Sequence, residues 1–84
     1  SYSLDEKARI KSANDIRSLG IPVDWQDHSL NDLVDMKLRI QLTKSLASKG
    51  WKVDWSQHTL KEMLDLWTLV RSQEKSNVAS GVID

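Results

Sequence analysis

The sequence predicts an all-α fold, a small three-helix domain built from a tandem helix–long loop–helix repeat that shares its central helix. A shift of 30 residues superimposes one loop on another, placing Gly20, Val23, Asp24, Trp25 and His28 on Gly50, Val53, Asp54, Trp55 and His58. Apolar residues recur with helical spacing before, between and after these two loops. Helix-ending glycines and helix-capping Ser or Thr residues mark the boundaries of each expected helix.

The first helix is expected over residues 4–19. Ser3 is suited to cap its N-terminus, and the acidic residues that follow favour the positive end of the helix dipole. Gly20 ends the helix, because glycine adopts the left-handed conformation of that position at little cost. Pro22 follows two residues later and cannot continue a helix.

The second helix is expected from Leu30 to about Lys49, with Ser29 as its cap. It carries two apolar stripes, one of Leu30, Leu33, Val34 and Ile40 and one of Leu38, Leu42 and Leu46. A helix that is apolar around much of its circumference is enclosed by neighbours. We therefore expect it to lie between the first and third helices.

The third helix is expected from Leu60 to about Gln73, since Thr59 and Glu62 have the spacing of a capping box. Periodicity is then lost, so residues 74–84 are expected to form a flexible tail. The predicted organisation is a single helical domain over 1–73, with repeat copies at about 10–41 and 40–71.

The repeated loop offers Asp and His side chains with a spacing that metal sites also use, namely Asp24, His28, Asp54 and His58. The two loops are expected at opposite ends of a helix roughly 28 Å long, too far apart for one ion within one chain, although a dimer could pair the first loop with the second. A structural role is the stronger interpretation. The aspartates are expected to accept backbone N–H bonds, and the histidines to pack next to the caps. We expect no metal and no cofactor.

The tryptophans divide into two groups. Trp25 and Trp55 repeat strictly beside a valine, which favours a packing role in the two corners. Trp51 replaces Ile21, and Trp67 replaces Lys37, so these two are particular to the second copy. With Leu66 and Leu69 they are the candidate partner-binding residues, because surplus apolar side chains on a small domain usually mark an interface.

Composition argues against several classes of function. The chain has twelve basic and twelve acidic residues and no cysteine, which excludes disulfides and thiol chemistry and gives no overall basic excess. It also lacks a phosphate-binding glycine loop and a nucleophile elbow. We expect a non-enzymatic, cytoplasmic protein–protein interaction or assembly module, acting as adaptor, accessory subunit or regulator and able to self-associate, with no membrane partner.

The alternative is a module that binds nucleic acid. Residues 19–23, Leu-Gly-Ile-Pro-Val, followed by a capped helix with Asp32, Leu33 and Val34, resemble the helix-extended-loop-helix pattern of SAP and LEM-like domains. The resemblance covers about 20 residues and implies DNA or chromatin binding through the loop and the start of the second helix. Asp27 and His28 stand where that pattern expects a basic residue.

Overall fold

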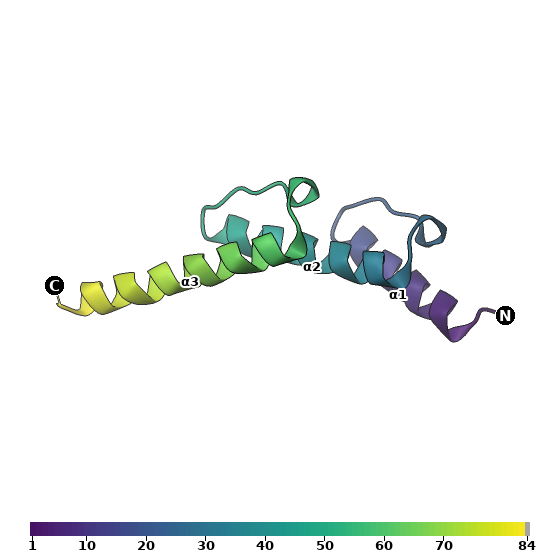
Figure 1. The fold of residues 1–84 in the computed structure, drawn as a ribbon, viewed down its shortest axis with the longest axis horizontal. Helices are drawn as coiled ribbons and strands as arrows, with labels where there is room; N and C mark the ends of the chain where they lie inside the picture. The colour runs from purple at the N-terminus through teal and green to yellow at the C-terminus, as the bar shows by residue number, and fades with distance from the viewer. Residues whose placement is uncertain (84) are drawn as a thin grey trace.

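The computed structural model describes the backbone of residues 1–83 and the side chains of residues 1–74. Helix α1 spans Leu4–Ser18, α2 spans Leu30–Ser48 and α3 spans Leu60–Ile83 (Figure 1). Each connection contains one short turn of 3-10 helix, η1 at Trp25–Asp27 and η2 at Trp55–Gln57. The described backbone contains no strand, and the predicted all-α, three-helix class is confirmed.

Side chains cap the start of each helix. The Ser3 hydroxyl accepts a hydrogen bond from the Glu6 amide at 3.1 Å, and the Glu6 carboxylate accepts one from the Ser3 amide at 2.9 Å. Thr59 and Glu62 form the same reciprocal pair at 3.1 and 2.8 Å. At α2 the Ser29 hydroxyl accepts a hydrogen bond from the Asp32 amide at 3.1 Å, without a reciprocal bond. Reciprocal capping boxes therefore start α1 and α3.

Glycine ends α1 and α2 in the same way. Gly20 and Gly50 have φ values of 94° and 88°, the left-handed conformation that glycine adopts without a steric cost. After each of them the chain folds back, so that the Ile21 amide donates to the Ile16 carbonyl and the Trp51 amide to the Leu46 carbonyl. These bonds satisfy carbonyls that the helix end would otherwise leave unpaired.

Helix α3 continues to Ile83, ten residues beyond the end predicted at Gln73. The loss of apolar periodicity suggested an earlier end, yet no proline and no glycine interrupts residues 74–80. A helix does not have to end where its apolar periodicity fades if no stop signal is present. The flexible tail was predicted over residues 74–84, and the side chains of residues 75–84 lie outside the described part of the chain.

The three helices run in the same direction, each displaced along the long axis from the one before (Figure 1). Contacts along α2 show this order. Arg39, in the middle of α2, donates to the Trp55 carbonyl just before α3 begins, and Lys49, just after α2, pairs with Glu74 farther along α3. The molecule is elongated, with extents of 62 × 22 × 21 Å. Both long loops lie on one side of the row of helices.

Helix α2 is central, as predicted, and it divides the interior into two small cores. The first contains Ala13, Ile16, Leu33 and Ile40, and the second contains Leu46, Met63 and Val70. Buried positions correspond across the 30-residue shift, as Ile16 does to Leu46 and Ile40 does to Val70. Trp55 packs against both cores and so connects them.

Candidate functional site

The two aspartates of the repeated loops bind the backbone locally. Asp24 accepts a hydrogen bond from the Gln26 amide, and Asp54 accepts one from the Ser56 amide, both at 3.0 Å. Asp54 also accepts from the Ser56 hydroxyl at 2.6 Å, and these bonds hold the pKa of its carboxyl below the ordinary value. Each aspartate thereby fixes the 3-10 turn that carries the tryptophan.

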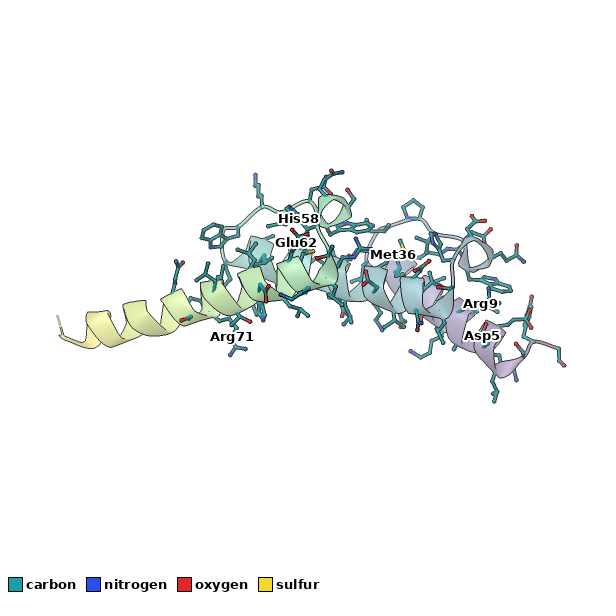
Figure 2. All side chains as sticks on the ribbon, viewed as in Figure 1. Asp5, Arg9, Met36, His58, Glu62 and Arg71 are labelled. Carbon is teal, nitrogen blue, oxygen red and sulfur yellow. The ribbon has the colours of Figure 1, made fainter. Side chains whose placement is uncertain are left out.

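An arginine from the preceding helix holds each loop tryptophan. The Arg9 guanidinium lies 4.9 Å from the centre of the Trp25 ring, and Arg39 lies 5.2 Å from that of Trp55. Each arginine also pairs with an aspartate one turn earlier, Asp5 or Asp35; Asp5 and Arg9 are labelled in Figure 2. The stacked cation and the carboxylate clamp the loop onto its helix. The Asp–Arg pairs also repeat at a spacing of 30 residues. They lie in the helices, so the repeated loop sequence alone does not reveal them.

The second loop returns to the middle of α2, which corrects the expectation that the two loops lie at opposite ends of this helix. Arg39 donates to the Trp55 carbonyl at 3.0 Å and to the His58 carbonyl at 3.3 Å. His28 is half-buried and His58 is exposed. Among the residues whose side chains are described, no three His, Asp or Glu side chains gather as metal ligands would.

The surface that distinguishes the two copies is an apolar groove between α2 and α3. Its volume is about 200 Å³, and it has no charged side chain in its lining, which consists of Leu38, Gln41, Leu42, Ser45, Leu60, Leu64 and Trp67. Leu38 and Leu64 remain 42% and 45% exposed. The two leucines are too exposed to be core residues, and they stand beside a half-buried tryptophan. We refer to these seven residues as the α2–α3 groove.

The corresponding surface of the first copy, between α1 and α2, carries salt bridges. Moving back by 30 residues replaces Gln41, Ser45 and Trp67 of the groove with Lys11, Asp15 and Lys37. The Asp15 carboxylate lies 2.8 Å from the Lys37 ammonium and 3.3 Å from that of Lys11.

These two partners, Lys37 foremost, hold the pKa of Asp15 below its ordinary value. The same shift also turns Leu38 and Leu42 into Ala8 and Ser12. The second copy has therefore exchanged an ionic, smaller surface for an open apolar one.

The four predicted partner-binding residues do not form one surface. Trp67 lies in the α2–α3 groove, whereas Leu66 packs against the second core and lines a depression beneath the second loop. Leu69 is 55% exposed, but it follows Leu64 by five residues and so lies about 140° away around the helix. Trp51 is 46% exposed at the corner after α2.

The sequence interpretation missed Leu38, Leu42, Leu60 and Leu64 as functional candidates. Helical periodicity placed the first two in a stripe of the second helix, and the other two in a stripe of the third helix with Met63, Trp67 and Val70. A complete alignment of the two copies would have identified the difference. On this surface the second copy has leucine or tryptophan where the first has Ala8, Ser12, Val34 and Lys37, and it has uncharged Gln41 and Ser45 where the first has Lys11 and Asp15.

Some positions that are apolar on α2 hold polar side chains on α1 and α3. On α1, Ser3 and Glu6 occupy the positions that hold buried or half-buried Leu33 and Met36 on α2. On α3, Ser72 and Gln73 occupy the positions of Leu42 and Thr43.

No protein-family model, curated protein or solved structure matches this chain. In the described part of the chain, no helix is both long and apolar enough to cross a membrane.

Proposed function

We propose that the protein is a non-enzymatic protein–protein interaction module, an adaptor, accessory subunit or regulator, that binds an apolar segment of its partner in the α2–α3 groove. The observation that carries this proposal is the exchange of the Asp15 ion pairs for the open surface around Leu38, Leu64 and Trp67. Exposed apolar side chains around a concave site lose their contact with water when a complementary surface covers them.

The size of the groove favours protein side chains over a small ligand. Small-molecule sites usually measure about 300–1,000 Å³ and place several polar groups around their ligand. This groove measures about 200 Å³ and offers only Gln41 and Ser45 as polar side chains. It accommodates a few apolar side chains of a partner. A second copy of this chain is one such partner.

Nucleic acid binding is less well supported. The SAP-like pattern would present the first loop and the start of α2 to phosphate groups. Exposed Asp24 and Asp27 lie in that loop, and exposed Asp32 lies in the first turn of α2. Carboxylates at this position repel a phosphate backbone.

The proposal is tested by selecting partners from a library of displayed helical peptides with no preset charge. Selected peptides should lose binding when Leu64→Lys places a charge in the groove. They should keep it with Leu69→Lys, a matched change at an exposed leucine on another side of α3. Circular dichroism checks that both variants fold. Equal binding to both variants, or no enrichment of any peptide, would overturn the proposal.

A further inference from the structure

The α2–α3 groove has cations at both of its ends. Lys37 immediately precedes Leu38, where the groove begins on α2. Arg71 follows Trp67 by one helical turn, and its guanidinium lies 5.9 Å from the centre of the Trp67 ring. The lining between them has no charged side chain. An occupant of the groove therefore meets an apolar middle, Arg71 at one end, and at the other end the Lys37 ammonium, which also pairs with Asp15.

Positive charge continues along the same side of all three helices. Lys7 and Lys37 stand at the positions equivalent to Trp67, and Lys11 and Arg71 stand at those equivalent to Gln41. Among the described residues that correspond to groove positions in the other helices, only Asp15 is acidic. Lys11 and Lys37 both pair with it. This side of the molecule thus has a basic surplus although the whole chain has a net charge of zero.

The side of the loops carries both acidic and basic side chains. Asp24, Asp27 and Asp54 are exposed there, and Figure 2 shows Arg71 pointing away from the side on which His58 lies. On α2, Gln41 of the groove is about half a turn from Arg39, which holds the second loop. Lys52 is exposed on the second loop, and Arg9, Arg17 and Arg39 contact the loops. The loop side therefore carries both signs of charge, whereas the groove side is mainly basic, and an acidic partner is attracted to the groove side.

We infer that the α2–α3 groove binds one amphipathic helix whose apolar stripe is flanked by aspartate or glutamate. The groove runs from Leu38 to Ser45 on α2, a length of about 10 Å, or two turns of a partner helix. Such a helix inserts apolar side chains at i, i+3 or i+4, and i+7. Its acidic residues then lie near Lys37 and Arg71. A concave site fits a helix better than it fits a flat lipid surface or a phosphate backbone.

This inference rests on the proposed function, and a set of synthetic helical peptides tests it. All carry the same leucine stripe, flanked by Glu, Gln or Lys. Fluorescence anisotropy measures their affinity for the full chain at low salt and at 0.5 M NaCl. The Glu peptide should bind most tightly and the Lys peptide least. Added salt should lower the affinity of the Glu peptide to about that of the Gln peptide, because salt screens exposed charges.

Two variants with the same charge change locate the effect. Arg71→Glu should weaken binding of the Glu peptide about three- to tenfold, the range of one or two exposed ion pairs. The affinity of the Gln peptide should not change. Lys52→Glu, on the second loop, should leave both unchanged. Equal affinity of the Glu, Gln and Lys peptides would overturn the acidic preference while keeping the groove. Failure of every peptide would overturn the proposed function with it. Tighter binding to anionic vesicles or to a DNA duplex, or displacement of the peptide by a second copy of the chain, would replace the acidic helix as occupant.

Discussion

Trp55 connects the two cores, so its removal should destabilise the fold more than that of any other tryptophan with described contacts. The ring packs against both clusters of buried residues and lies beneath the Arg39 guanidinium at 5.2 Å. In Trp55→Ala both cores lose part of their cover, and the bound arginine loses its aromatic partner.

The expected magnitude follows from the burial of Trp55. Replacing a fully buried Trp by Ala costs about 3–5 kcal/mol, and the half-buried Trp55 should fall below the middle of that range. Loss of the cation–π contact adds about 0.5–1 kcal/mol. A total of about 3 kcal/mol is a large fraction of the roughly 4–12 kcal/mol expected for a chain of this length. With a urea m-value of about 1 kcal/mol/M, the unfolding midpoint falls by about 3 M.

Urea unfolding followed by far-ultraviolet circular dichroism measures this effect without relying on tryptophan fluorescence. Trp25→Ala should cost less, because that ring packs against one core only. Trp51→Ala is the matched control, since its ring is 46% exposed and belongs to neither core, and should cost no more than about 1 kcal/mol. If Trp51→Ala unfolds the protein while Trp55→Ala is silent, the assignment of core and surface is wrong.

Two further predictions concern stability. Gly50→Ala should cost about 1–2 kcal/mol in urea unfolding, because the residue has a φ of 88° although no atom lies within 4 Å of the added Cβ; an unchanged midpoint would show that the turn relaxes. Hydrogen bonds lower the pKa values of the Asp54 and Glu62 carboxyls below their ordinary 3.8 and 4.5. The ionised carboxyls therefore stabilise the fold at a pH above these ordinary values. This stabilisation is lost as the pH falls through the folded-state pKa. Unfolding at pH 7 and pH 3 should show lower stability at pH 3, less so in Glu62→Gln, and equal stability would contradict the capping account.

Local signals predicted most of the backbone. Capping residues and glycine stops placed the starts of all three helices and the ends of α1 and α2 within one residue. The end of α3 was missed, since weak apolar periodicity is not itself a stop signal. The parallel course of the helices was not predicted either. It depends on clamps between distant residues, such as Arg39 with Trp55, which no pattern within one helix reveals.

The candidate site was harder to predict, because exposure depends on where neighbouring helices end. Leu64 follows the same apolar stripe as buried Met63 and Val70, yet it is 45% exposed. Val34, the equivalent residue of the first copy, is 43% exposed as well, so in neither copy does a neighbouring helix cover this position. A helical wheel identifies apolar positions but does not show whether a neighbour covers them.

Methyl nuclear magnetic resonance of the full chain tests the groove most directly. The protein is labelled at its leucine methyl groups and titrated with the Glu-flanked helical peptide. Methyl signals of Leu38, Leu42, Leu60 and Leu64 should shift together and saturate with one peptide per chain, while those of exposed Leu4 and Leu69 stay in place. Shifts centred on Leu69, or no saturable shift at any leucine, would contradict the assignment of the α2–α3 groove as the binding site.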